Sequence, residues 1–243
     1  MIRPFRLVLL LVLLFGLALL IAFLPMRLAL EWSNLGERGL AARDIQGSIW
    51  SGRLIDTRFR DIPLGTFDAA LQPASLLATP MVAVTRPEGL TSTAGEQPFA
   101  AMLGGGTGHL VVREANGDIP LDRIAGRLPL SAARLSNISV DLDEGRCQSA
   151  SGEVQLVLSS WVGRFAAQNG LRGTLKCDGD ALMVRGAGQS GLETLSFRVE
   201  PDGRYRAELA IEGLSEELAF GLRGLGFRRS GNAMVLGTKG LLR

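Results

Sequence analysis

The chain has 243 residues, with 26 basic and 24 acidic side chains, one histidine and two cysteines. Three of the arginines, Arg3, Arg6 and Arg27, precede residue 31, which leaves 23 basic against 24 acidic residues beyond it. This near-neutral balance, with no basic cluster along the sequence, argues against a nucleic-acid-binding protein, which needs positive charge to neutralise phosphates. The length beyond residue 30 fits one large domain or two small ones.

Residues 7–24 form an apolar run without a single charge. As a helix rising about 1.5 Å per residue, this run is roughly 27 Å long, close to the roughly 30 Å hydrocarbon core of a bilayer. Arg3 and Arg6 precede it, and positive charge beside a first span stays in the cytoplasm. We therefore predict a cytoplasmic tail at 1–6, a transmembrane anchor at 7–30 and a periplasmic β-rich domain at 31–243.

A cleaved secretory signal is the alternative to a retained anchor, and it would place the rest of the chain in the same compartment. The apolar run is longer than the roughly 7 to 15 residues of a signal core. The residues that follow, Pro25, Met26, Arg27 and Leu28, offer no small-x-small cleavage site. A buried core helix is disfavoured because no face of the run is polar. These features favour retention in the cell inner membrane.

The residues after the apolar run continue a helical pattern. Leu28, Trp32 and Leu35 recur at spacings of three and four, and Gly39 marks the end of this segment. Trp32 suits the membrane interface, where an indole ring lies partly in lipid with its N–H in water. We therefore predict a helix that leaves the membrane from residue 26 to about residue 38.

Beyond residue 40 the pattern changes to short runs of alternating apolar and polar residues, separated by glycine and proline turns. The predicted strands cover 44–54, 62–71, 81–85, 109–112, 138–142, 152–158, 173–177, 181–185, 194–200, 204–212 and 235–241. Hairpin turns are predicted at 178–180, 186–191 and 201–203, short helices at 161–169 and 215–225, and helical turns at 73–77 and 131–135. We expect a mainly β fold, either a curled antiparallel sheet or a sandwich, with a few short helices.

The two cysteines, Cys147 and Cys177, both follow the predicted anchor. Thiols outside the inner membrane meet an oxidising environment, so the simplest prediction is one disulfide that closes a loop of about thirty residues. Metal binding or redox chemistry is the alternative, but it requires further ligands or a C-x-x-C spacing.

Few residues of the chain are candidates for catalysis or metal binding. The single histidine, His109, lies in a predicted strand, where a structural role is favoured over a Ser-His-Asp triad. Asp141 and Asp143 share a strand face, but a calcium site needs more oxygen ligands in a defined loop. Residues 104–106 are three glycines followed by a strand, which favours a bend or bulge over a phosphate-binding loop. We expect no enzyme activity, no cofactor and no metal.

Several short segments occur in a characteristic order. The most specific is a G-x-x-W-S-G pattern at Gly47-Ser48-Ile49-Trp50-Ser51-Gly52. The others are Arg3-Pro4-Phe5-Arg6, Ile62-Pro63-Leu64-Gly65, Leu71-Gln72-Pro73-Ala74-Ser75-Leu76-Leu77, Gly126-Arg127-Leu128-Pro129-Leu130 and Asp202-Gly203-Arg204-Tyr205. In these segments the chain resembles the type II secretion system protein N family, whereas residues 85–106 match its pattern little.

The resemblance implies an accessory inner-membrane component of the machine that exports folded proteins across the outer membrane of Gram-negative bacteria. Its implied partners are other type II secretion subunits, including inner-membrane components and the secretin. The family has no established active site, so no catalytic residue is transferred. A second interpretation is an AsmA-like lipid-handling protein, because a single anchor followed by a curled sheet with an apolar concave face is typical of both.

Trp50 has two possible roles in either interpretation. Gly47 and Gly52 on each side of it allow another backbone to approach closely, which favours packing of the indole in a core. The alternative is a contact with a partner protein that also involves Ser51 and Gly52. We predict Trp50, Ser51 and Gly52 as the candidate contact site.

Overall fold

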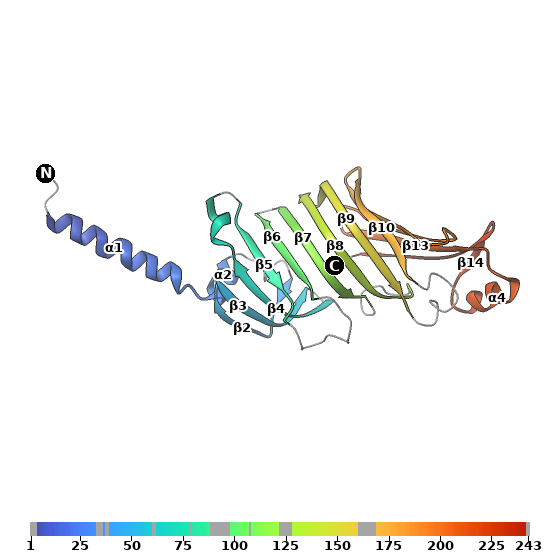
Figure 1. Cartoon of the computed structure of the whole chain (residues 1–243), viewed down its shortest axis with the longest axis horizontal. Helices are drawn as coiled ribbons and strands as arrows, with labels where there is room; N and C mark the ends of the chain where they lie inside the picture. Colours follow the sequence, from blue (N-terminus) through green and yellow to red (C-terminus); the bar gives the residue numbers. More distant parts are fainter. Residues whose placement is uncertain are drawn as a thin grey trace.

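The chain forms an apolar helix at one end and a single long β-sheet over most of the remainder (Figure 1). This computed structural model describes residues 4–32, 36, 39–59, 62–77, 79–87, 98–106, 108–121, 128–159 and 169–241. The helices in these ranges are α1 (Pro4–Ala22), α2 (Met26–Trp32) and α4 (Glu216–Gly224), with a 3-10 helix η1 (Pro73–Leu77).

Helix α1 projects away from the sheet (Figure 1). Its leucine- and alanine-rich sequence favours the helix, and most of its large apolar side chains are exposed, with Leu13 at 66% and Leu20 at 71%. Among the described residues, no helix meets both the length and the hydropathy required to cross a membrane. The helix predicted from residue 26 to about residue 38 begins as predicted and is α2 as far as Trp32, whereas residues 33–35 and 37–38 lie outside the described ones. A break separates α1 from α2, because Pro25 lacks the N–H that would continue α1.

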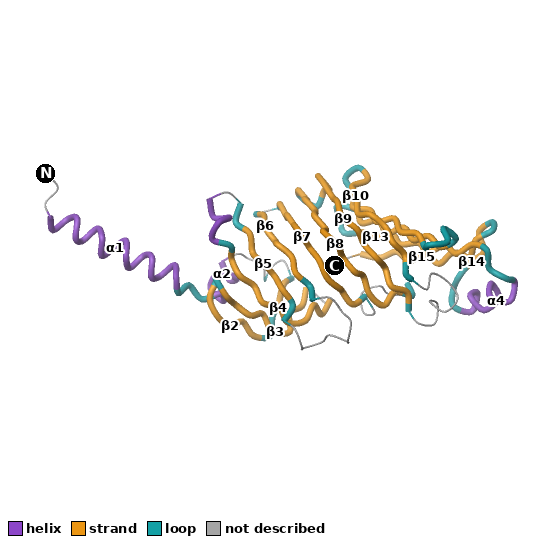
Figure 2. The backbone as a smooth tube through the Cα atoms, in the orientation of Figure 1, coloured by secondary structure: helices purple, strands orange, loops and turns teal. Residues whose placement is uncertain are grey.

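All strands of the described chain belong to one sheet (Figure 2). The first seven are β1 (Leu40–Ala41), β2 (Asp44–Ser48), β3 (Ser51–Phe59), β4 (Ile62–Leu71), β5 (Met81–Thr85), β6 (Ala100–Gly105) and β7 (His109–Pro120). The remaining strands are β8 (Leu130–Asp143), β9 (Arg146–Leu158), β10 (Leu171–Asp178), β11 (Ala181–Ala187), β12 (Glu193–Val199), β13 (Arg204–Glu212), β14 (Arg228–Ser230) and β15 (Ala233–Leu241).

The sheet is an antiparallel meander in which strands pair in the order β1-β3-β4-β5-β6-β7-β8-β9-β10-β11-β12-β13-β15-β14. Strand β2 pairs with β3 outside this order. The sheet curls, so that the strands after β9 turn behind those before it (Figure 1). The predicted mainly β, antiparallel architecture is therefore confirmed.

Several predicted elements differ from the observed ones. The segment predicted as one strand at 44–54 is the hairpin β2–β3, with Ile49 and Trp50 in its turn. The helical turn predicted at 131–135 is wrong, because these residues extend β8 and pair with both β7 and β9. The helix predicted at 215–225 is confirmed as α4, where the Ser215 hydroxyl accepts a hydrogen bond from the Leu218 N–H. Most of the helix predicted at 161–169 lies outside the described residues.

One face of the sheet carries most of the apolar core. Strict alternation along β10 to β15 places Leu171, Leu209 and Ile211 on this face, and each of them is at most 2% exposed. Helix α4 covers part of the same core with Ala219. A second, smaller core lies next to α2 and consists of Met26, Leu54 and Ala69. The long sheet therefore has a main core and a separate core beside the helical segment.

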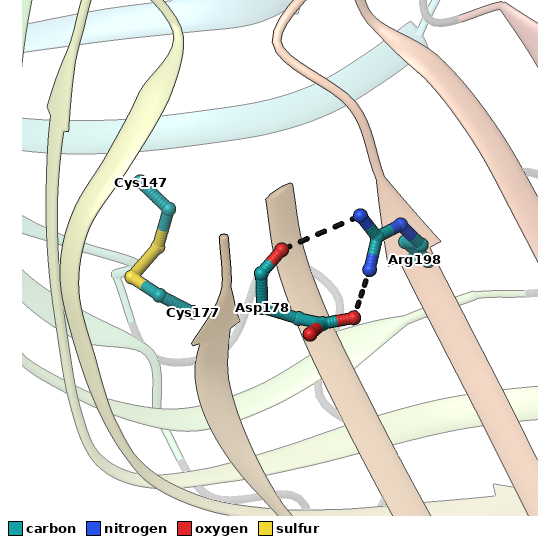
Figure 3. Close-up of a disulfide and its surroundings, with 4 residues drawn as sticks. All are labelled: Cys147, Cys177, Asp178 and Arg198. Atoms are coloured by element: carbon teal, nitrogen blue, oxygen red, sulfur yellow. Dashed lines mark hydrogen bonds and ion pairs between the residues drawn. A yellow bond between two sulfur atoms is a disulfide. The ribbon is translucent and has the colours of Figure 1, made fainter. Parts of the chain in front are cut away.

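The predicted disulfide between Cys147 and Cys177 is present, with a Cα–Cα distance of 5.6 Å (Figure 3). It lies beside the ladder between β9 and β10, which covers only residues 153–156 against 171–174. The Cys147 N–H also donates to the Asp180 carbonyl at 2.8 Å. The disulfide thus joins the two strands where backbone pairing between them has ended.

Candidate functional site

The predicted contact residues lie where the helical segment meets the sheet, a region that we call the joint and define as residues 21–26 and 47–52. The indole Nε1–H of Trp50 donates a hydrogen bond to the Ile21 carbonyl at 3.0 Å. Ile21 lies in the last turn of α1, and its carbonyl lacks the usual helical donor because residue 25 is proline, accepting instead a long hydrogen bond from the Leu24 N–H at 3.4 Å. The tryptophan of the W-S-G pattern therefore caps the end of the apolar helix.

Backbone hydrogen bonds reinforce this connection. The Ile49 N–H donates to the Leu24 carbonyl at 3.0 Å, and Pro25 forms an isolated antiparallel bridge with Ser48. The Ile49 carbonyl in turn accepts from the Leu71 N–H of β4 at 2.8 Å. The segment between α1 and α2 is thus held against the β2–β3 hairpin and, through it, against the rest of the sheet.

The two glycines of the pattern are required by close packing. A Cβ atom on Gly52 would lie 2.1 Å from the Met26 sulfur and about 3 Å from the Ser48 and Gln46 carbonyl oxygens, so the Met26 side chain would have to shift to admit it. Gly47 has φ +85°, and a Cβ atom there would lie 2.3 Å from the Ser51 carbonyl oxygen. Met26 is only 7% exposed. The absence of side chains at the two glycines therefore lets α2 pack tightly against the β2–β3 hairpin.

A charged pair lies beside the joint on the exposed face. Arg53 forms two hydrogen bonds with the Asp68 carboxylate across β3 and β4, at 2.6 Å from Nε and 3.0 Å from Nη2. The hydrogen bonds and the attraction of the carboxylate raise the pKa of Arg53 above its ordinary value. The pair ties β3 to β4 directly beside Gly52.

The structure brings the three predicted contact residues together but gives them different environments. Trp50 is half-buried and bonded within the chain, Gly52 is buried, and Ser51 is exposed. Their role as a partner contact stays a prediction. The sequence did not identify Ile21 and Met26, although the glycines around Trp50 already indicated a close approach by another segment.

The other residues considered for chemistry have structural partners. His109 Nε2 lies 2.7 Å from Asp141 Oδ1, and both side chains are partly exposed on the neighbouring strands β7 and β8. Gly105 has φ +130°, and the Gly106 N–H donates to the His109 carbonyl at 2.9 Å, so these glycines form a hairpin turn. Within the described ranges, no group of three or more metal-ligating side chains is found.

Comparisons with known proteins place the chain in one family. No curated protein and no solved structure matches it significantly. The family model described as type II secretion system (T2SS), protein N matches residues 38–236, most of the chain and nearly all of the sheet. The chain therefore belongs to the type II secretion system protein N family.

Proposed function

We propose that the chain is a tethered periplasmic subunit that contacts other components of the type II secretion machine. In this proposal α1 anchors the protein in the inner membrane, residues 1–6 are cytoplasmic, and the sheet lies in the periplasm. Membership of the family makes the chain a component of the type II secretion system and implies interaction with other components. The family is a secretion component and is not known as an enzyme.

The joint is the observation that carries this proposal. The Trp50–Ile21 and Ile49–Leu24 hydrogen bonds connect the apolar helix to the sheet at two points, and Met26 fills the space above Gly52. A helix attached in this way fixes the orientation of the sheet relative to whatever surrounds the helix. A subunit that presents its sheet to neighbouring proteins at the membrane benefits from such a fixed orientation.

The helix itself and the disulfide support the proposed location. Phe15 is 67% exposed and Phe23 is 76% exposed, and such apolar side chains favour a lipid environment over water. The Cys147–Cys177 disulfide suits an oxidising compartment such as the periplasm. The predicted inside position of Arg3 and Arg6 gives the same orientation.

The experiment is photocrosslinking in native membranes, with a photoreactive residue in place of Ser51 in one variant and Phe220 in another. Both positions are exposed, and they lie on the joint and on α4 respectively. We expect ultraviolet-dependent crosslinks to secretin or to inner-membrane secretion subunits, and none in membranes kept dark. Crosslinks to phospholipid alone at both positions would instead favour the AsmA-like lipid-handling interpretation.

A further inference from the structure

The outward face of the sheet from β10 to β15 gathers basic side chains. Alternation along the paired strands brings three consecutive rows of residues to this face. The rows contain one acidic residue, Glu208, and seven basic residues: Arg172, Lys176, Arg185, Arg198, Arg206, Arg228 and Lys239. We call these seven residues the basic face.

Most of this charge has no partner within the described chain. Arg198 pairs with Asp178 and Glu200, as Figure 3 shows for Asp178. The other six basic side chains are exposed and form no ion pair with another described residue. The accumulation is notable because the chain beyond residue 30 has slightly more acidic than basic residues.

The pairing register places like charges directly opposite one another. Arg198 lies opposite Arg206, and Arg206 lies opposite Lys239, so three cations cross three neighbouring strands in one row. Residues in such positions have Cβ atoms about 5 Å apart, and like charges there destabilise a sheet. A bound group of negative charge would remove this repulsion.

The same face is hollowed. A depression of about 370 Å³ lies among Arg172, Arg185 and Glu208. Its floor is formed by small side chains of β11 to β13, namely Ala187, Thr194, Ser196 and Ala210. From strand and residue spacings, the three rows cover roughly 20 Å by 13 Å, enough for several carboxylates of a protein surface.

We propose that the basic face is the docking surface for an acidic, carboxylate-bearing surface of another protein subunit. This inference rests on the proposed function, since it names the chemistry of one partner of the tethered sheet. A protein is favoured over anionic lipid as the partner because the basic face lies far along the sheet from the proposed membrane anchor. The face begins at β10, seven strand steps from the joint strand β3, or about 34 Å along the sheet. The membrane's charge is screened over about 8 Å.

The test compares two double variants of the full chain in native membranes. The first, Arg185→Glu with Arg206→Glu, reverses the charge at two positions of the basic face. The control, Arg58→Glu with Arg113→Glu, makes the same charge change at exposed positions of β3 and β7 that form no ion pair with a described residue. Each variant and the wild-type chain are purified in mild detergent, and the secretion subunits recovered with them are quantified at low and high salt.

We expect the basic-face variant to recover at least tenfold less of one subunit than wild type, and the control to recover a wild-type amount. High salt should release the same subunit from the wild-type chain, because screening weakens charged contacts. The melting temperature of the basic-face variant should be unchanged or higher, since Arg206→Glu removes the repulsion of Arg206 with Arg198 on one side and with Lys239 on the other.

Three results would overturn the inference. Equal losses in both variants would show a general charge effect, and full recovery by the basic-face variant would show that the face is not used. A photoreactive residue at Thr174, in the middle row, that crosslinks only phospholipid would assign the face to the membrane. If the wild-type chain itself recovers no secretion subunit, the proposed function fails. If the wild-type chain recovers a subunit and the basic-face variant recovers the same amount, only the inference about the basic face fails.

Discussion

At the scale of single residues, the joint gives Trp50 a defined task. Its ring is half-buried, yet its N–H is committed to the Ile21 carbonyl, so the residue both packs and caps a helix end. This combination explains why neither a purely core role nor a purely surface role describes it. The polar atom of the indole is what distinguishes tryptophan from phenylalanine at this position.

Replacing Trp50 with Phe should loosen α1 relative to the sheet while preserving most of the packing. The lost hydrogen bond contributes about 0.5–1.5 kcal/mol to the connection. Spin labels at Phe15→Cys and Gln46→Cys would report the distance between α1 and β2, since the native cysteines are bonded to each other. We expect a broader distance distribution for Trp50→Phe, and an unchanged one for Trp32→Phe, whose ring is 71% exposed. An unchanged distribution in both would contradict the capping role.

Replacing Gly52 with Ala should destabilise the small core of the joint. The new methyl group would overlap the Met26 sulfur, and such overpacking costs about 1–3 kcal/mol. Urea unfolding of the full chain measures the loss. Gly186→Ala is the control, because a Cβ atom there has its nearest neighbour at an ordinary 3.5 Å. Met26→Ala should cost less in the Gly52→Ala background than in the wild type, because the new methyl group occupies part of the space that Met26 leaves. Equal losses of unfolding free energy for Gly52→Ala and Gly186→Ala would contradict the packing argument.

At the scale of elements, the boundary between β9 and β10 has the shortest ladder among the pairs formed by strands of seven or more residues. Its ladder joins only residues 153–156 with 171–174, whereas β8 and β9 pair along almost their whole length. The Cys147–Cys177 disulfide and the Cys147–Asp180 hydrogen bond lie just beyond the end of this ladder. The covalent link therefore compensates for missing backbone pairing between the two halves of the sheet.

Removing the disulfide should lower the free energy of unfolding substantially. With a sequence separation of 30 between the cysteines, the chain-entropy model predicts a loss of about 3.5 kcal/mol. The Cys147→Ser, Cys177→Ser double variant should unfold at a lower urea concentration than the oxidised wild type. Reductant should bring the wild type to the same midpoint and leave the double variant unaffected. A wild-type midpoint that does not respond to complete reduction would contradict this role.

At the scale of the whole molecule, each of the two cores stabilises its own part of the sheet. The main core runs from Ala101 to Leu236, whereas Met26, Leu54 and Ala69 form the separate core at the joint. Met26 belongs to the helical segment, so the joint core depends on residues that precede the sheet. Damage at the joint should therefore remain local.

A fragment that begins at residue 33 tests this division, because it lacks Met26 and Leu30 of the joint core. Compared with a fragment that begins at residue 23, it should lose amide-exchange protection in β2 to β4 and keep it in β8 to β13. Hydrogen-exchange mass spectrometry resolves the two regions. Equal loss of protection across the whole sheet would show that the cores unfold as one unit.

The structural features that could be predicted from the sequence are those determined by residues close together in the chain, such as hairpin turns. The glycines at 179 and 203 predicted the turns between β10 and β11 and between β12 and β13, and both have positive φ. The strand lengths were underestimated, because β-bulges let β8 continue past polar residues such as Asn137, which has φ +51°. Alternation cannot reveal such irregular pairing.

The joint and the basic face could not be predicted, because both depend on register and on contacts between distant segments. Gly52 indicates a close neighbour, but only the folded chain identifies it as Met26. Arg198, Arg206 and Lys239 form no cluster along the sequence, and they become neighbours only when three strands align. Counting charges along the chain therefore cannot reveal this row of cations.

The meander order has a consequence for how the chain folds. Nearly every strand pairs with the strand that precedes it in the sequence, so each can add to the sheet as soon as it emerges. Under the proposed anchoring of α1, assembly proceeds from the tethered end without waiting for distant segments. The disulfide closes only after β10 has brought Cys177 to Cys147, by which time the β1–β9 half of the sheet is already available as a template.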